Sequence, residues 1–348
     1  MALSRRKCLF GLTSATWAST WPGGWAAAAS AEGAHRIQVA IAARHSLYHL
    51  PLVLADQLGY VRQAGLSIQW LEVESGAHVS QAVLSGRADV GAGAFEHVLG
   101  LHGLRQDHRA FVLLGRTPQL ALAVQSRWAR PLSMGLPIPG LKLGISALHS
   151  GSHWAAQYWL LRQGLSAQEV NWLELGVTPS AVIDAFREGR VDAYCGPDPI
   201  IHWLEQKHEA RVLAEARTLA SATRWLGAAT PGCCLYASGA WLTRQAAAAQ
   251  GLSDALVLAL KWLRTAGPTD LLRALPMPAG AVDRALFLGA FEKVRESYNT
   301  DGNFNDSAVF NAWRSYLHLP SVQGPLNLAL ESTFTNDFVG RARRRTAA

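Results

Sequence analysis

A chain of 348 residues is long enough for two domains. Hydrophobic residues make up 49% of it and charged residues 16%, a balance that indicates a globular protein with a large core and excludes a disordered or fibrous chain. The net charge of +7 comes from the two ends of the chain. The basic residues responsible are Arg5, Arg6, Lys7, Arg341, Arg343, Arg344 and Arg345. The remainder has no net charge, so we expect no nucleic acid among the partners.

Residues 1–31 have the pattern of an export signal. Ser4-Arg5-Arg6-Lys7 is followed by a mildly apolar stretch over 8–21 and by small residues around Ala29–Ala31, where cleavage is expected. The paired arginines resemble a twin-arginine signal, although Cys8-Leu9 stands where that motif prefers Phe-Leu, so the general secretory route stays open. The segment contains no run of about 18 apolar residues, so a membrane anchor is the less favoured interpretation.

Four cysteines are too few for a disulfide scaffold. After removal of the signal, Cys195, Cys233 and Cys234 remain. One disulfide is possible, but buried and unreactive thiols are the simpler interpretation.

The chain contains a pseudo-repeat. Residues 82–93 (AVLSGRADVGAG) and 185–196 (AFREGRVDAYCG) share the pattern A-x-x-x-G-R-x-D-x-x-x-G. Two earlier pairs of segments, 39–46 with 143–150 and 64–72 with 163–171, match in the same order at nearly the same offset. We interpret these matches as two copies of one structural unit.

Each copy alternates strands and helices. The first is predicted to contain strands at 37–41, 68–73 and 88–92, with helices from Leu50 to Gln63 and through 79–83. The second is predicted to contain strands at 143–146, 170–175 and 191–195, with helices over 152–163 and 180–188. The helices end at glycines, Gly65, Gly86 and Gly189 among them, because glycine enters the left-handed conformation without strain.

This alternation predicts two α/β lobes, each with a mostly parallel sheet flanked by helices. Ligands of such sheets bind at the carboxyl ends of the strands. Two facing lobes therefore predict a binding cleft between them that closes by hinge motion.

Three segments resemble the nitrate/sulfonate/taurine group of periplasmic substrate-binding proteins, which serve ABC importers. They are 50–95, with its helix, strand, Ser-Gly loop and G-x-x-D block; 139–165, with its Gly-Ser element; and GRVDAYCGPDP at 189–199. The resemblance is good over 36–207 and implies the type II periplasmic-binding-protein fold.

In that fold the chain crosses to the second lobe and returns, here near 118–122 and 225–236. The expected domains are then a first lobe of 35–120 with 226–335, a second lobe of 121–225, and a basic solvated tail over 336–348.

Ligand contacts are expected from the loops that follow the strands. In the first lobe these are the loop of Arg44, His45 and Ser46, the Ser75-Gly76 turn, and Ala94-Phe95. Arg44 and His45 offer charge to an anion, and the backbone of their loop is the better candidate. The alternative is that Ser75 caps a helix and that tight turns require the glycines.

In the second lobe the strongest candidate is Ser150-Gly151-Ser152, which opens a helix whose free N–H groups and dipole favour an anion. Gly196-Pro197-Asp198-Pro199 stands where the family carries its Trp-Glu-Pro block, with Pro197 in place of the Trp, and Cys195 directly before it is a further candidate. The alternative role of Asp198 is a cap of the next helix. Thr117 and Trp225 are candidates only because they lie near the crossings. Tyr48, Phe95, Trp154 and Tyr194 are candidates for stacking on a flat ligand.

The sequence lacks the motifs of common enzymes, such as G-x-S-x-G, H-E-x-x-H and Walker A. Histidine pairs four residues apart, His45 with His49 and His149 with His153, are too few for a zinc site, so we expect no metal and no cofactor.

The sequence therefore indicates an exported, periplasmic, monomeric binding protein without catalytic activity. We expect it to capture a small organic anion, such as a sulfonate, a taurine-like compound or an aromatic carboxylate rather than nitrate, and to deliver it to an ABC permease. Two alternatives stay open. One is an enzyme or a thiamine-pyrimidine-precursor protein of the same fold, which would need an acid–base pair such as Asp198 with His45. The other is a sensor module that docks on a membrane receptor.

Overall fold

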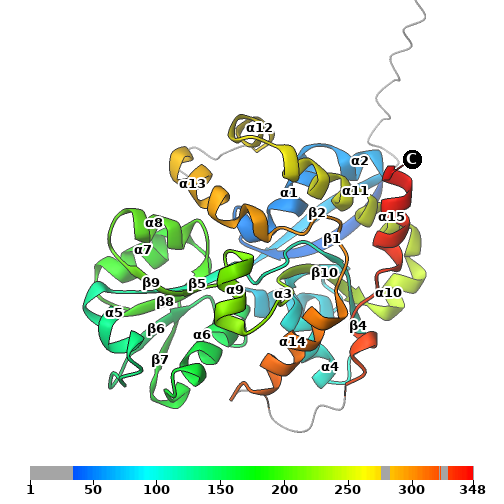
Figure 1. Cartoon of the computed structure of the whole chain (residues 1–348). Helices are drawn as coiled ribbons and strands as arrows, with labels where there is room; N and C mark the ends of the chain where they lie inside the picture. The colour runs from blue at the N-terminus through cyan, green and yellow to red at the C-terminus, as the bar shows by residue number, and fades with distance from the viewer. Residues whose placement is uncertain (1–33, 276–282, 321, 323–327, 348) are drawn as a thin grey trace, which may run out of the picture. The chain divides into compact units, whose positions relative to one another are not determined.

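Two five-stranded sheets organise the chain (Figure 1). The computed structural model describes residues 34–275, 283–320, 322 and 328–347. The expected export signal lies outside these residues. Within the described ranges no helix is long and apolar enough to cross a membrane.

The first sheet has the order β2-β1-β3-β10-β4. Strands β1, β2 and β3 are parallel, whereas β10 runs antiparallel to both of its neighbours. The strand bounds are β1 His35–Ala42, β2 Leu66–Val73, β3 Val90–Ala94, β4 His108–Leu113 and β10 Cys233–Ser238. Buried apolar side chains cover both faces of this sheet, as expected for parallel strands between helices.

The second sheet repeats this plan in the order β7-β6-β8-β5-β9. Strands β6, β7 and β8 are parallel, and β5 is the antiparallel strand between β8 and β9. The strand bounds are β5 Leu120–Val124, β6 Lys142–Ile145, β7 Asn171–Glu174, β8 Ala193–Pro197 and β9 Arg211–Glu215. The two-lobed fold predicted from the sequence is therefore confirmed.

Helices flank both sheets (Figure 1). Those of the first lobe are α1 (Leu50–Gln57), α2 (Tyr60–Gln63), α3 (Gly76–Leu84), α4 (Phe95–Gly103), α10 (Gly239–Arg244), α11 (Ala246–Thr265), α12 (Pro268–Ala274), α13 (Arg284–Val294), α14 (Asp306–Leu317) and α15 (Asp337–Ala347). Those of the second lobe are α5 (Ser126–Ser133), α6 (Gly151–Arg162), α7 (Pro179–Arg187), α8 (Ile200–Gln206) and α9 (Leu219–Leu226). Short 3-10 turns are η2 (Leu47–His49), η3 (Ala167–Glu169), η4 (Arg295–Ser297) and η5 (Leu330–Ser332).

The repeated aspartate has the same structural role in both lobes. The Asp89 carboxylate accepts a hydrogen bond of 2.9 Å from the N–H of Gln38 in β1. The Asp192 carboxylate accepts one of 3.1 Å from the N–H of Lys142 in β6. In each lobe this bond ties the residue before the third strand to the first strand, which explains why the pattern recurs.

One predicted helix is divided. The segment from Leu50 to Gln63 forms α1 and α2, because Gly59 between them has a φ of +79°. Left-handed backbone ends a helix, and glycine adopts it without steric cost. Gly65, Gly86 and Gly189 also have positive φ, between 67° and 73°, at the predicted helix ends.

The chain passes between the lobes over 114–119 and 227–232, and Thr117 of the first segment contacts both Ala216 and the second segment. The Thr117 hydroxyl donates a 2.6 Å hydrogen bond to the Ala216 carbonyl oxygen. A Cβ placed on Gly232 would overlap the Thr117 carbonyl, so glycine is required by this close approach. The hinge therefore consists of two chain segments that pack against each other.

The basic C-terminal residues do not form the solvated tail that their charge suggested. Residues of α15 bury Phe338, Val339 and Ala342 in the first-lobe core. Arg341 donates to the side chain of Gln250 at 2.6 Å, and Arg345 contacts Asp254 at 2.8 Å. Apolar residues at helical spacing dock α15 on α11, and the arginines bond along its edge.

Candidate ligand-binding site

Loops from both sheets meet around a small cavity between the lobes. Its volume is about 40 Å³, which is room for only one or two water molecules. The residues that line it are Tyr48, Ala94, Glu96, Pro118, Leu120, Gly151, Trp154, Ala155, Tyr158, Leu226, Thr230, Ala312, Ser315, Tyr316 and Leu319. They come from the ends of β1, β3 and β6, from both crossing segments, and from α14.

The lobes are closed against each other around this cavity. The buried Ser46 hydroxyl donates a 3.3 Å hydrogen bond to the backbone oxygen of Asp198 in the opposite lobe. A Cβ on Gly151 would lie 3.3 Å from the Cβ of Ala94. These contacts leave little space for a solute, so the cleft must open to admit one.

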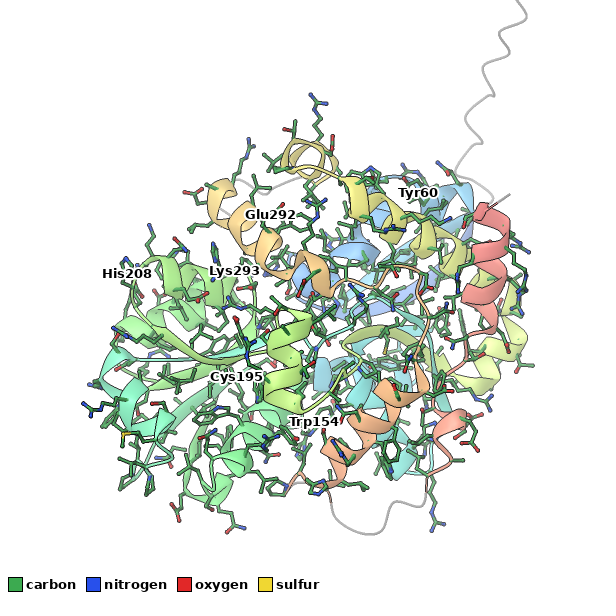
Figure 2. All side chains as sticks on the ribbon, viewed as in Figure 1. Tyr60, Trp154, Cys195, His208, Glu292 and Lys293 are labelled. Atoms are coloured by element: carbon green, nitrogen blue, oxygen red, sulfur yellow. The ribbon has the colours of Figure 1, made fainter. Side chains whose placement is uncertain are left out.

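Trp154 fills much of the cleft. It belongs to α6 of the second lobe but packs within an apolar cluster of the first lobe (Figure 2). Its ring centre lies 5.1 Å from that of His97 and 5.6 Å from that of Tyr316. An aromatic side chain thus occupies the position between the lobes where a bound solute is expected.

Glu96 is the one charged residue among those that line the cavity in the described structure. It is half-buried, and its carboxylate forms no hydrogen bond or ion pair with another described residue. Burial raises its pKa from 4.5 to about 7, although its own backbone N–H partly offsets the shift. The pKa of Tyr316 rises to about 12 because of its burial and the charge of Glu96. The cavity therefore has an acidic rather than a basic wall.

His97 lies behind Trp154 and is only 4% exposed. Neither of its ring nitrogens has a hydrogen-bond partner, and burial lowers its pKa to about 4, so the ring is neutral. A Cβ on Gly76 would lie 2.6 Å from the imidazole, which explains the need for glycine there.

The N-terminus of α6 reaches the cavity at Gly151. The hydroxyls of Ser146, Ser150 and Ser152 bond to one another over 2.9–3.0 Å, and Ser150 also caps His153. The N–H groups of Gly151 and Ser152 have no acceptor among the described residues. An anion at this point would be held by backbone donors, while the serine hydroxyls hold the loop in shape.

The other first-lobe candidates lie around the cavity rather than in its wall. Arg44 pairs with Glu72 at 3.3 Å and covers Trp70, and His45 is exposed. Ser75 is buried as the N-cap of α3 and bonds His78. Phe95 is wholly buried in the core, so of the Ala94-Phe95 pair only Ala94 lines the cavity.

Cys195, Trp225 and Thr117 also lie outside the cavity wall, and in two cases a neighbouring residue lines the cavity instead. Cys195 is a buried free thiol in the core of the second sheet, as are Cys233 and Cys234 in the first. Trp225 packs in the second-lobe core, and its neighbour Leu226 lines the cavity instead. Thr117 lies in the first crossing segment and bonds the Ala216 carbonyl oxygen, and its neighbour Pro118 lines the cavity.

Asp198 serves as a helix cap inside a buried ionic cluster. Its carboxylate accepts a 2.8 Å bond from the His202 N–H and lies 3.6 Å from Arg217, which is itself only 2% exposed. Burial raises the pKa of Asp198 to about 6, an effect that Arg217 partly offsets. His45 takes no part in this cluster, so Asp198 and His45, the example of an acid–base pair given above, are not paired. Among the described residues no three His, Cys, Asp or Glu side chains are placed to hold a metal.

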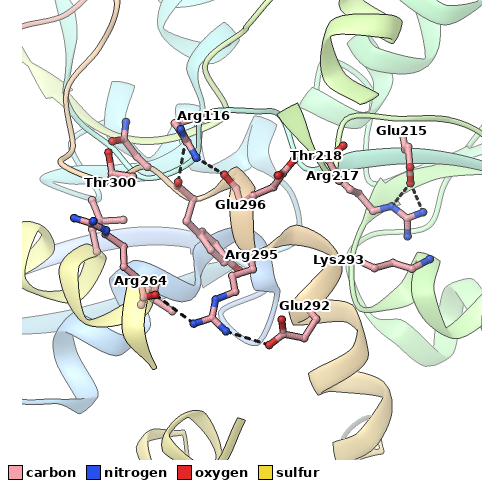
Figure 3. Close-up of a pocket in the computed structure, with 14 residues that line it drawn as sticks. Arg116, Glu215, Arg217, Thr218, Arg264, Glu292, Lys293, Arg295, Glu296 and Thr300 are labelled. Carbon is pink, nitrogen blue, oxygen red and sulfur yellow. Dashed lines mark hydrogen bonds and ion pairs between the residues drawn. The ribbon is translucent and has the colours of Figure 1, made fainter. Parts of the chain in front are cut away.

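A wider cavity of about 730 Å³ lies on the other side of the hinge (Figure 3). Its charged side chains are largely paired with each other: Arg217 with Glu215, Arg295 with Glu292, and Arg116 with the carbonyls of Glu296 and Tyr298. Lys293 of the first lobe reaches Glu205 of the second at 2.9 Å. The pair of Lys293 with Glu205 connects the lobes, and we assign this cavity a structural role.

Sequence reasoning did not select Glu96, Tyr158 or Tyr316. Glu96 directly follows the predicted Gly93-Ala94-Phe95 loop, so its position was a usable signal. Tyr316 lies in a helix far along the chain, and nothing in the sequence indicated that α14 faces the cleft.

Comparison with known proteins agrees with this geometry. Residues 32–273, more than half of the chain, match the NMT1-like family. The chain belongs to the NMT1-like family. A search of curated proteins found no match.

Solved structures share the architecture of this NMT1-like protein. A protein of Bordetella bronchiseptica RB50 is 28% identical, covers 90% of this chain and 98% of its own, and superimposes with a TM-score of 0.84. The alkanesulfonate-binding protein SsuA from Xanthomonas axonopodis pv. citri, bound to MOPS, is 18% identical over 86% and 98% of the two chains, with a TM-score of 0.64. The periplasmic nitrate-binding protein NrtA from Synechocystis PCC 6803 is 11% identical over 90% and 89%, with a TM-score of 0.69.

The resemblance identified in the sequence is thus confirmed, and the fold is that of periplasmic substrate-binding proteins of ABC importers. The fold alone does not specify binding rather than catalysis, because the desulfurization enzyme DszB also shares it, at 16% identity and a TM-score of 0.57.

Proposed function

We propose that this chain is an exported solute-binding protein of an ABC importer and that it captures a small organic anion, such as a sulfonate or a carboxylate, between its lobes. The observation that carries the proposal is the cavity itself, since it lies at the carboxyl ends of the strands of both sheets. A solute held there touches both lobes and so favours the closed arrangement.

The N-terminus of α6 supports an acidic group on the solute. It offers two backbone N–H groups without acceptors, and a helix dipole that favours negative charge. Tyr48, Trp154, Tyr158 and Tyr316 supply an aromatic wall for the remainder of the solute. An inorganic ion such as nitrate would leave this wall unused.

The proposed partner is the permease of an ABC importer, which would recognise the closed form in the periplasm. Support comes from the fold shared with the binding proteins for alkanesulfonate and nitrate. The unformed pair of Asp198 and His45 disfavours catalysis in the cleft.

A thermal-shift screen of the purified protein tests this function. The panel contains sulfonates, aromatic carboxylates, nitrate, bicarbonate and pyrimidines. A solute at about 100 times its Kd adds about 2.7 kcal/mol to the unfolding free energy, and the melting temperature rises accordingly. In the variant Gly151→Leu the new side chain fills the cavity, so the shift should vanish. A shift that persists in the variant would place binding elsewhere, and a panel without any shift would contradict the function.

A further inference from the structure

The wall of the interlobe cavity has the composition of a site for a positively charged nitrogen. Four of its residues are aromatic, namely Tyr48, Trp154, Tyr158 and Tyr316. Glu96 is the one charged residue that lines it in the described structure. Aromatic faces attract ammonium groups, and aromatic cages with a nearby carboxylate are a common way to bind them.

Glu96 is free to accept such a group. Its carboxylate has no side-chain partner among the described residues, and it is half-buried at the cavity rather than pointing into bulk water. Tyr48 and Tyr316 line the same cavity as Glu96, and burial, together with the negative charge of Glu96, raises the pKa of both phenols. Two arginines near the hinge have other partners: Arg217 pairs with three carboxylates, and Arg116 donates to the carbonyl oxygens of Glu296 and Tyr298.

The acidic wall and the N-terminus of α6 are close enough for one small molecule to reach both. Gly151, at the start of α6, lies against Ala94, and Ala94 is two residues before Glu96. A plain organic anion bound at α6 would therefore face an unpaired carboxylate. An organic acid that also contains a cationic nitrogen would satisfy both ends.

We propose that the solute is a small zwitterion, with its cationic nitrogen held by Glu96 and the aromatic rings and its acidic group held by the N-terminus of α6. Trp154 now covers part of this site, so opening of the lobes must withdraw the indole before the solute is bound. This inference rests on the proposed function and specifies its substrate class.

Three probes of similar size test the inference at pH 8, where Glu96 is ionised. Glycine betaine has both charges, 3,3-dimethylbutanoate is its carbon isostere without the positive charge, and choline has only the positive charge. Binding is measured by titration calorimetry. We expect glycine betaine to bind about tenfold or more tightly than 3,3-dimethylbutanoate, with choline weaker than the betaine.

The variant Glu96→Gln should weaken the binding of glycine betaine about tenfold, because the charge attraction is lost. The affinity for 3,3-dimethylbutanoate should stay equal or increase. Glu169→Gln, the same change at an exposed position in η3, is the control and should change neither affinity. Taurine and ethanesulfonate form a second pair, with and without the amine, if the acidic group must be a sulfonate.

The outcomes separate this inference from the proposed function. Equal affinity for the charged and uncharged members of both pairs, or no effect of Glu96→Gln, would overturn the zwitterion while the binding function stands. Absence of binding by every probe would also overturn it, and the thermal-shift panel then decides whether any solute binds.

Discussion

The indole of Trp154 and the phenol of Tyr316 meet edge to face across the two lobes, at an interplanar angle of 84°. Trp154 belongs to α6 of the second lobe and Tyr316 to α14 of the first. Their contact, with that of Trp154 and His97, joins the two lobes in the closed arrangement without any solute. A solute must therefore compete with an internal aromatic contact, and the protein should be sensitive to the loss of that contact.

Replacement of Trp154 by alanine should favour the open form. The side chain is 7% exposed, and its loss removes the apolar link between the lobes. We expect a larger radius of gyration in small-angle scattering of the solute-free protein. The matched control is Trp203→Ala, since Trp203 of α8 stacks against Arg187, also a second-lobe residue. The interpretation fails if Trp154→Ala scatters like the wild type.

Arg217→Met should destabilise the whole protein. The guanidinium is almost inaccessible and faces Asp198, Glu205 and Glu215, so its loss leaves the buried Asp198 carboxylate without a cationic partner. The expected loss is about 3–5 kcal/mol of unfolding free energy, measured by denaturant titration. Arg190→Met breaks the exposed pair with Glu188 and should cost less than about 1 kcal/mol. Similar losses in the two variants would show that burial of the cluster is unimportant.

Glu96→Gln should change the pH dependence of stability. The folded pKa of Glu96 is about 7, above its ordinary value of 4.5, so the folded state binds the extra proton between these values. Unfolding free energy that is present below pH 4.5 is then lost as the pH rises through 7, by on the order of 2 kcal/mol. The groups that face Glu96 are Tyr48, Cys234 and Tyr316, whose pKa values lie far above this window, and the neutral His97.

Thermal or urea unfolding at pH 5 and pH 8 measures this effect. The variant should lose less stability than the wild type between the two pH values, whereas the exposed Glu169→Gln should follow the wild type. Parallel profiles for Glu96→Gln and the wild type would contradict the assignment of the raised pKa.

Gly232→Ala should disrupt the hinge. The new methyl group would overlap the Thr117 carbonyl, so the two crossing segments must separate, at a cost of about 1–3 kcal/mol or more. Gly340→Ala lies inside α15, where a Cβ meets only the far end of Arg344, and should stabilise by about 0.5–1 kcal/mol. Melting curves of the two variants should move in opposite directions, and a neutral Gly232→Ala would refute the close packing of the crossings.

Much of the fold was predictable because the chain repeats itself. The two aspartates of the repeat, Asp89 and Asp192, make the same bond to the first strand of their lobes, so the sequence pattern reports a shared structural need. Helix ends at Gly86 and Gly189 were predictable for the same reason, since both positions have positive φ. Local rules of this kind depend on few residues.

The site was less predictable because it depends on which side chain faces the cleft. Asp198 stands in the motif expected to bind solute, yet its carboxylate caps α8 and faces Arg217. Trp225 lies near a crossing, yet it packs into the second-lobe core. Tyr316 comes from α14, which shares no motif with the repeats and reaches the cleft only through tertiary packing. Strand ends could be located from the pattern, but side-chain directions there are set by packing.

The most direct test follows the solute itself. The compound with the largest thermal shift is mixed with an equal amount of protein, and the solute is examined by NMR when bound and again after release by denaturation. We predict one molecule bound per chain and an unchanged spectrum after hours of contact. New resonances from a converted product would contradict the account.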